Sequence, residues 1–124
     1  MKITVTTQLN ATENAEKIKT ALETVFPKMV FKVSKTSISG SSDDVVNLHY
    51  IKEKVIEKRI KNTARYLILQ YRTDAGARIM LNKQTLLFGK INFVEEEYPM
   101  GNVVVDIETD NIEGLADYIV GLIN

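Results

Sequence analysis

The 124-residue sequence contains no cysteine, no tryptophan and a single histidine. Without cysteine the chain forms neither a disulfide nor a thiolate metal site, and one histidine leaves zinc too few of its usual ligands. The fold must therefore be stabilised by its apolar core. A chain of this length buries about two-thirds of the surface that its unfolded form exposes, which suffices for one stable domain spanning residues 1–124.

Long apolar runs are also absent. None approaches the roughly 20 residues that a membrane-spanning helix needs. The N-terminal segment MKITVTTQL alternates apolar and polar residues, whereas a signal peptide has a continuous apolar stretch. Together with the missing cysteines, these patterns predict a cytoplasmic protein in a reducing compartment, with no membrane partner.

Recognisable catalytic motifs are missing as well. The glycines are scattered and form no phosphate-binding loop, and no serine motif accompanies His49 as a nucleophile–base pair. Asp106, Glu108 and Asp110 share one face of a predicted strand, where a divalent-metal site is conceivable. A polar sheet face paired with basic side chains is favoured instead. The basic residues available for this pairing are Lys2, Lys32, Arg78 and Lys90. The sequence predicts no enzyme and no cofactor or metal.

The net charge is zero, but the charges are unevenly distributed along the chain. Residues 1–51 hold six Lys/Arg and five Asp/Glu, and residues 52–90 hold ten and three. Residues 91–124 hold eight acidic residues and no basic one. Such segregation is typical of a polyanion-binding face. It is equally typical of two segments that lie side by side and neutralise each other, and the sequence leaves both alternatives open.

Apolar periodicity predicts the secondary structure. Alternation indicates strands over residues 2–7, 29–33, 79–81, 91–93 and 103–107. Helical spacing indicates helices over residues 15–26, 44–61, 62–71, 83–88 and 112–122. The serine-rich residues 37–42 are expected to form a loop, and residues 73–77 and 98–101 turns. This order predicts an α+β fold, a single domain with helices packed on one face of a largely antiparallel sheet.

Polar side chains before the helices are the expected caps, because they accept hydrogen bonds from free backbone N–H groups. Asn14 is expected to cap the first helix, and Ser42 or Asp43 the second. Several apolar side chains near the element ends are expected to face the core: Val33, Val45, Ile56, Phe88 and Leu122.

The polar trio Asn82, Lys83 and Gln84 interrupts the apolar segment MLNKQTLLFGKINF. Asn82 is expected to cap a short helix that Gly89 ends in the left-handed conformation. A lysine in the first helical turn opposes the helix dipole, whereas a bound phosphate would reverse that effect. The trio therefore predicts a phosphate site with Lys83 exposed beside Arg65 or Lys90. The alternatives are a lysine that simply points into solvent and a salt bridge with the acidic C-terminal third.

The densest basic run lies on helical sequence. Its members Lys54, Lys58, Lys61 and Arg65 are spaced four, three and four apart, which places them on one face if the helix is continuous. Such a row can track a phosphate backbone, and the alternative is a solvated charged face. Tyr50, Tyr66 and Tyr71 flank the run and could stack on bases, but half-buried packing is favoured. Recognition of RNA backbone or shape is therefore expected.

Four short segments carry a resemblance to a known family. They are Ile60-Lys61-Asn62-Thr63-Ala64-Arg65, Leu81-Asn82-Lys83-Gln84, Gly89-Lys90-Ile91-Asn92-Phe93 and Pro99-Met100-Gly101. Together they resemble an archaeal family of uncharacterised, predicted exosome-associated RNA-binding proteins. The chain departs from that family at Asn62, where Asp is usual, and after Asp117, where the family tends to continue Trp-Leu-Ala-Pro. The resemblance implies RNA binding and a fold similar to the large-subunit ribosomal protein that contacts the small ribosomal RNA.

The predicted function is non-catalytic binding of RNA backbone or shape by a basic helix and loop region. The candidate RNA-binding residues are Lys54, Lys58, Lys61, Arg65, Asn82, Lys83, Gln84 and Lys90. The alternative function is a protein–protein interaction module or assembly subunit that uses the acidic C-terminal third or a sheet edge.

Overall fold

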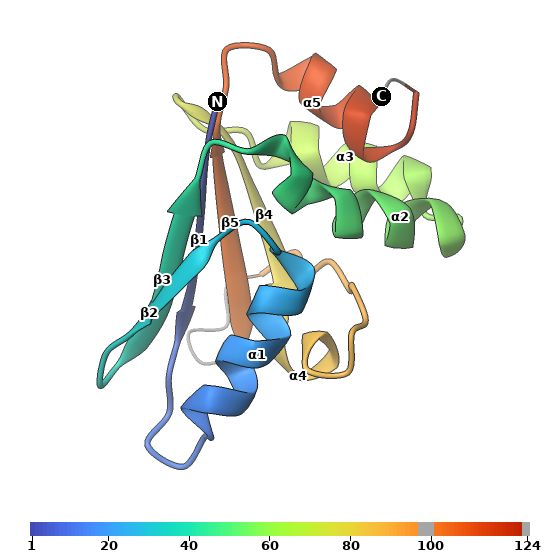
Figure 1. Ribbon diagram of the computed structural model, residues 1–124. Helices are drawn as coiled ribbons and strands as arrows, with labels where there is room; N and C mark the ends of the chain where they lie inside the picture. The colour runs from blue at the N-terminus through green and yellow to red at the C-terminus, as the bar shows by residue number, and fades with distance from the viewer. Residues whose placement is uncertain (97–100, 123–124) are drawn as a thin grey trace.

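The computed structural model describes residues 1–96 and 101–122, which form an antiparallel five-stranded sheet with helices on one face (Figure 1). The strand order is β2-β3-β1-β5-β4. The strands are β1 (Lys2–Gln8), β2 (Val30–Val33), β3 (Ser37–Ser42), β4 (Gly76–Asn82) and β5 (Asn102–Glu108). The helices are α1 (Ala15–Val25), the 3-10 helix η1 (Val45–Leu48), α2 (His49–Glu57), α3 (Lys61–Gln70), α4 (Lys83–Leu86) and α5 (Ile112–Ile119). The predicted α+β class is confirmed.

Alternating apolar residues place one face of the sheet against the helices. β1 lies between β3 and β5, with Val5 opposite Gly40 on one side and Val105 on the other. Ile3 and Val5 are fully buried in the resulting core, as the alternation predicts. Toward one end of the sheet α2, α3 and α5 cover this face, and α1 and α4 cover it toward the other end (Figure 1).

The prediction of a loop over residues 37–42 is wrong, because these residues form β3. Serine has a low β propensity, but β3 pairs with β1 and β2 on its two sides and buries Ile38 completely. Gly40 lies so close to β2 that a Cβ atom there would approach the Val30 carbonyl oxygen to 2.8 Å. Tertiary pairing therefore overrides local propensity in this segment.

The region predicted as one helix from about residue 44 to 61 is more divided than expected. Asp44, and not Ser42 or Asp43, caps η1 by accepting a hydrogen bond from the Val46 N–H. The first cap is correct, since Asn14 accepts from the Lys17 N–H. Several side chains predicted to face the core are exposed, and all of them lie at or near the end of a helix or strand: Val33, Val45, Ile56, Phe88 and Leu122.

A tight helix end separates α2 from α3. The Ile60 N–H donates to the Val55 carbonyl and the Arg59 N–H to the Ile56 carbonyl, which is the Schellman arrangement. It places Arg59 at a φ of 58°, in the left-handed region. α3 then begins at Lys61 in a new direction, so the single-face row of Lys54, Lys58, Lys61 and Arg65 is not formed.

The strand predicted over residues 91–93 is also absent from the described part of the chain as a regular element. Phe93 makes only an isolated bridge to Leu81, and Ile91 packs into the core. The predicted turn at 98–101 falls mostly on residues 98–100, which lie outside the described residues. No helix within the two described ranges is long and apolar enough to cross a membrane.

Candidate nucleic-acid interface

The polar trio has the predicted cap but not the predicted exposure. The Asn82 side chain accepts a hydrogen bond from the Thr85 N–H at 3.0 Å and begins α4. Lys83, however, is fully buried, and its ammonium donates to the Gln8 carbonyl at 2.9 Å and to Glu13 at 2.8 Å. The prediction that Lys83 lies exposed beside Arg65 or Lys90 is therefore wrong. Its acidic partner comes from the β1–α1 connection and not from the C-terminal third.

The buried pair changes the titration of its acid. Burial alone would raise the pKa of Glu13, but the hydrogen bonds from Lys83 and Asn10 and the Lys83 charge outweigh it and lower that pKa. Glu13 is therefore ionised at neutral pH. Lys83 ties α4 to the N-terminal part of the chain, and its ammonium is not accessible to a ligand. Gln84, the next residue, is exposed on α4.

The basic and acidic segments neutralise each other in part. Arg65 on α3 forms an ion pair with Asp117 on α5, and Arg78 on β4 pairs with Asp106 on β5 at 2.8 Å. The second pair lies on the polar sheet face, as predicted for the alternating carboxylates. Among residues 1–96 and 101–122 no three His, Cys, Asp or Glu side chains are grouped so that they could hold a metal ion.

Lys52 is also used internally. It is almost completely buried, and its ammonium lies 4.7 Å above the centre of the Tyr118 ring. Burial, together with the nearby Glu53 carboxylate, raises the pKa of Tyr118. Lys52 and Arg65 thus join α2 and α3 to α5, and neither leaves a free charge on the surface.

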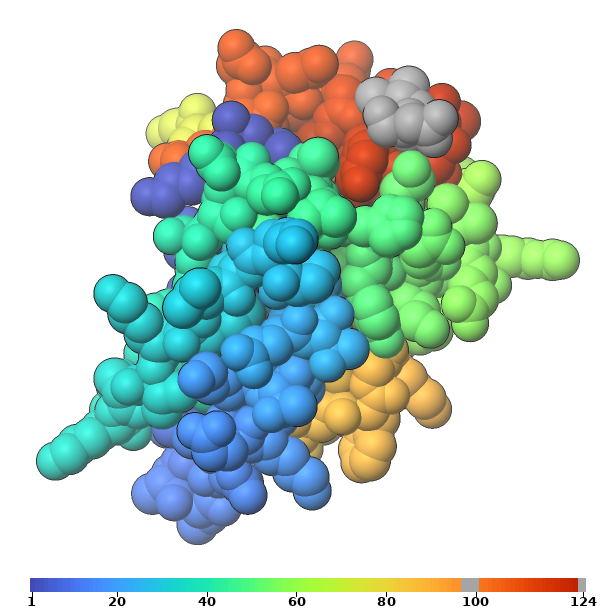
Figure 2. Space-filling view, viewed as in Figure 1, coloured from blue at the N-terminus to red at the C-terminus, as the bar shows by residue number. Residues whose placement is uncertain are grey.

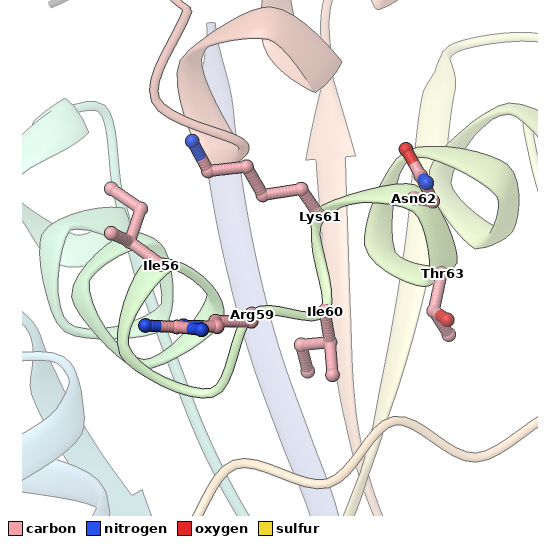
Figure 3. Close-up of a pocket in the computed structure, with 6 residues that line it drawn as sticks. All are labelled: Ile56, Arg59, Ile60, Lys61, Asn62 and Thr63. Carbon is pink, nitrogen blue, oxygen red and sulfur yellow. The ribbon is translucent and has the colours of Figure 1, made fainter.

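Two cations at the α2–α3 junction are not neutralised in this way. Arg59 and Lys61 form no ion pair with any residue that the structure describes. Both line an open hollow of about 660 Å³, which we call the junction hollow. Its lining residues are Ile56, Arg59, Ile60, Lys61, Asn62 and Thr63. In Figure 3 the Arg59 and Lys61 side chains extend toward the same side as Ile56, away from Asn62 and Thr63.

The N-terminus of α3 opens on the junction hollow. Ile60 occupies the cap position, and no side chain accepts a hydrogen bond from the first turn. Free N–H groups and the positive end of the helix dipole therefore remain available at Asn62 and Thr63. Lys61 opposes this dipole, and a bound anion would offset that repulsion. The sequence suggested a bound phosphate at Lys83, because a lysine in the first turn of a helix opposes the dipole. The same argument holds for Lys61, whose side chain is exposed.

The backbone of Arg59 gives a further indication. A left-handed conformation costs a residue with a side chain about 1 kcal/mol or more, whereas glycine adopts it freely. Most helices that end in this way use glycine or asparagine at this position. Arginine supplies a cation at the rim of the junction hollow in spite of its conformational cost.

A second group of cations lies beside the hollow, between α2 and the loop that follows α4. The Lys58 ammonium donates to the Ile91 carbonyl at 3.0 Å and to the Asn92 side chain at 2.8 Å. Lys54 is 3.5 Å from Glu57, and Lys90 is exposed and forms no ion pair with a described residue. Figure 2 shows the surfaces of α2 and of the segment after β4 next to each other. Three predicted residues therefore lie on α2 or on the loop that Lys58 contacts: Lys54, Lys58 and Lys90.

The tyrosines mostly pack as predicted. Tyr50 and Tyr71 are half-buried and donate their hydroxyls to the carbonyls of Gly89 and Glu95, at 2.7 Å and 2.6 Å. Tyr66 is 59% exposed on α3.

Two residues near these cations were not among the candidate RNA-binding residues predicted from the sequence, Arg59 and Phe88. The loss of apolar periodicity at residues 58–61 marks the helix break near Arg59, but no sequence signal distinguishes Phe88 from its buried neighbours.

Several known proteins resemble this chain over nearly its whole length. A family model described as RNA binding matches residues 2–109. A UPF0201 protein from Methanothermobacter thermautotrophicus is 32% identical over 119 residues, covering 95% of this chain and 89% of the relative. The crystal structure of an uncharacterized UPF0201 protein has a TM-score of 0.81 and 27% identity, covering 96% of this chain and 92% of that one. A UPF0201 protein from Methanococcus jannaschii shares the fold at a TM-score of 0.76 and 24% identity, with coverage of 96% and 92%.

Proposed function

Since the chain belongs to the archaeal UPF0201 family and matches a family model described as RNA binding, we propose that it binds RNA without acting on it catalytically. The carrying observation is the junction hollow, where Arg59 and Lys61 stand unpaired at the uncapped N-terminus of α3. Arg59, Lys61 and the N-terminus of α3 would contact phosphates of the RNA backbone, and Lys54, Lys58 and Lys90 would follow the adjoining backbone. Binding of this kind weakens steeply with added salt, because phosphate contacts release counterions.

Arg59→Gly provides the sharpest test of this proposal. The substitution removes the cation and at the same time relieves the left-handed backbone, so the free energy of unfolding should stay the same or rise. We expect RNA affinity at low salt to fall about tenfold, and the slope of log affinity against log salt to decrease by about 1. Fluorescence anisotropy with labelled RNA at several salt concentrations measures both quantities.

Lys17→Gln is the matched control, because it removes one exposed cation from α1 on another part of the surface. Its RNA affinity should remain close to that of the parent. RNA affinity that is absent in the parent, or insensitive to salt, would overturn RNA binding as the function. Equal losses in Arg59→Gly and Lys17→Gln would show a diffuse charge effect and remove the junction hollow as the site. Intact RNA after long incubation with the protein would agree with the non-catalytic proposal, and cleavage would overturn it.

The alternative function, a protein-interaction module, is favoured by the exposed edge of the sheet. β2 is an edge strand, and its Val30 and Val33 side chains are 81% and 42% exposed. Such an edge can accept a strand from another chain. A stable dimer in light scattering that Val30→Lys dissociates, with no RNA affinity in the parent, would support this alternative. Association with an exosome, which the sequence resemblance implies, is a finer proposal, and co-purification with exosome subunits tests it.

A further inference from the structure

Phe88 is the most exposed large apolar side chain of the described residues, with 82% of its surface accessible. A single exposed apolar residue is ordinary on a protein surface and indicates nothing alone. Its neighbours differ sharply, since Leu86 is buried and Leu87 is half-buried against the core. The chain therefore turns outward within two residues and directs one aromatic ring into solvent.

The backbone around Phe88 is held firmly. The Phe88 and Lys90 N–H groups both donate to the Thr85 carbonyl at 3.0 Å, and Gly89 makes the turn at a φ of 74°. The Tyr50 hydroxyl donates to the Gly89 carbonyl at 2.7 Å. Two hydrogen bonds from Lys58 then fix the loop at Ile91 and Asn92. The exposed ring thus projects from a backbone that hydrogen bonds hold in place, so the loop itself need not be ordered when a ligand binds.

Cations lie on the loop that carries this ring and on the neighbouring helix α2, and no acid lies in the loop itself. Residues 83–92 contain two lysines and no Asp or Glu. The Lys54 ammonium lies 5.4 Å from the centre of the Tyr50 ring, whose hydroxyl holds Gly89. Lys58 uses two hydrogen bonds on the loop and retains a third N–H, and Lys90 is exposed two residues after Phe88. We call Phe88 with Lys54, Lys58 and Lys90 the α2-loop surface.

We infer that the α2-loop surface binds an unpaired nucleotide, whose base stacks on the Phe88 ring while the flanking phosphates contact Lys58 and Lys90. This inference rests on the proposed RNA binding and names its substrate class as single-stranded RNA or an unpaired loop. A base in a duplex is covered by its neighbours and cannot offer its face to an aromatic side chain. Stacking on an aromatic ring tolerates every base, because each base has a π-face. The α2-loop surface should therefore distinguish unpaired from paired nucleotides, and not one base sequence from another.

Substitutions at Phe88 separate stacking from charge. The probe is a short single-stranded RNA that carries one 2-aminopurine, compared with the same RNA in a perfect duplex. Phe88→Ala should lose about tenfold or more in affinity for the single strand and change little for the duplex. Quenching of the 2-aminopurine fluorescence should occur with the parent and disappear in Phe88→Ala. Phe88→Tyr should restore both signals, whereas Phe88→Leu keeps apolar contact but should not restore quenching.

Tyr66→Ala is the matched control, because Tyr66 is an exposed aromatic residue on α3 and its loss should leave single-strand binding unchanged. The melting temperature of each variant should match the parent, because both rings are exposed. If the parent binds RNA with the expected salt dependence but Phe88→Ala binds the single strand equally well, this inference fails and the proposed function stands. If the parent binds no RNA, both fail. If Phe88→Ala changes only self-association in light scattering, the ring serves a protein contact and the inference is overturned.

Discussion

Lys83 and Arg59 belong to the same basic segment of the sequence, yet they have opposite surroundings. Lys83 is fully buried and donates two hydrogen bonds, one to the Gln8 carbonyl and one to the ionised Glu13 side chain. Arg59 stands at the rim of an open hollow, on left-handed backbone, without an ion pair to any described residue. A count of charges along the chain treats the two residues alike. The fold assigns one to stability and leaves the other available for a ligand.

The difference follows from the energetics of burial. Removing one partner of a buried ion pair leaves an uncompensated charge, which is strongly destabilising. An exposed cation is well solvated, and its loss changes stability by little. Affinity for a polyanion shows the reverse order, because only accessible cations displace counterions from phosphates. Measuring both the free energy of unfolding and the RNA affinity of each variant therefore tests whether Lys83 and Arg59 have these separate roles.

Lys83→Met should have the largest effect on stability. The substitution leaves the Glu13 carboxylate and the Gln8 carbonyl without their buried donor, and we expect a loss of about 3 kcal/mol in the free energy of unfolding. Urea denaturation followed by circular dichroism measures this value. RNA affinity of the folded variant should equal that of the parent, in contrast to Arg59→Gly.

Lys90→Met serves as the control, because Lys90 is exposed in the same stretch of chain and its loss should change stability by less than about 0.5 kcal/mol. A Lys83→Met protein as stable as Lys90→Met would show that the Glu13–Lys83 pair does not stabilise the fold. A large loss of RNA affinity in folded Lys83→Met would show that Lys83 contributes to RNA binding as well as to stability.

Gly89→Val should have the next largest effect on stability, and it probes the loop that follows α4. Gly89 has a φ of 74°, and an added Cβ would lie 2.9 Å from the Tyr50 hydroxyl oxygen. A β-branched residue resists this conformation, so we expect a loss of about 1–2 kcal/mol. Thermal unfolding measures the loss, and Gly121→Ala, at the other left-handed glycine, provides a comparison. Unchanged stability would contradict the left-handed assignment at Gly89.

Asn82→Ala should cost about 1 kcal/mol, because it removes the side chain that caps α4. Asn82→Asp should retain most of the stability, since aspartate accepts the same hydrogen bond. Both variants should bind RNA as the parent does, because Asn82 acts on the fold and not on the ligand. Lower RNA affinity in a fully folded Asn82→Ala would instead support the phosphate site that the sequence first suggested there.

Local sequence signals were sufficient for much of the fold. The caps at Asn14 and Asn82 and the left-handed Gly89 depend on residues within one or two turns, and the structure confirms all three. β3 was missed because its order comes from pairing with β1 and β2 and not from serine propensity. A break between two helices was predicted after residue 61, and the structure has it at residues 58–60. Its consequence for the basic row required the orientation of two separate helices.

The candidate site was harder to predict than the fold. Lys83 was assigned to a surface because its acidic partner, Glu13, lies 70 residues earlier in the chain. Arg65 was assigned to the RNA for the same reason, since Asp117 lies 52 residues later. Composition shows that basic and acidic segments exist, but only the fold shows which charges meet. Lys61 and Lys90 remain accessible, whereas Lys58 is partly engaged by the loop.

The smallest expected effect is on the free energy of unfolding at acid pH, where it tests whether Glu13 and Lys83 are coupled. The pKa of Glu13 is lowered in the folded protein, so the unfolded chain takes up this proton at a higher pH than the folded chain does. The contribution of ionised Glu13 is therefore complete above the usual glutamate pKa and is lost as the pH falls through the lowered folded value. Glu13→Gln should lack this part of the pH dependence, and the penalty of Lys83→Met should shrink over the same range, because a protonated Glu13 no longer leaves an unpaired charge. Urea denaturation of the parent and both variants between neutral and acid pH measures the difference. Parallel stability profiles for all three proteins would show that Glu13 and Lys83 are not coupled, and that the burial of Lys83 stabilises the fold only through the Gln8 carbonyl.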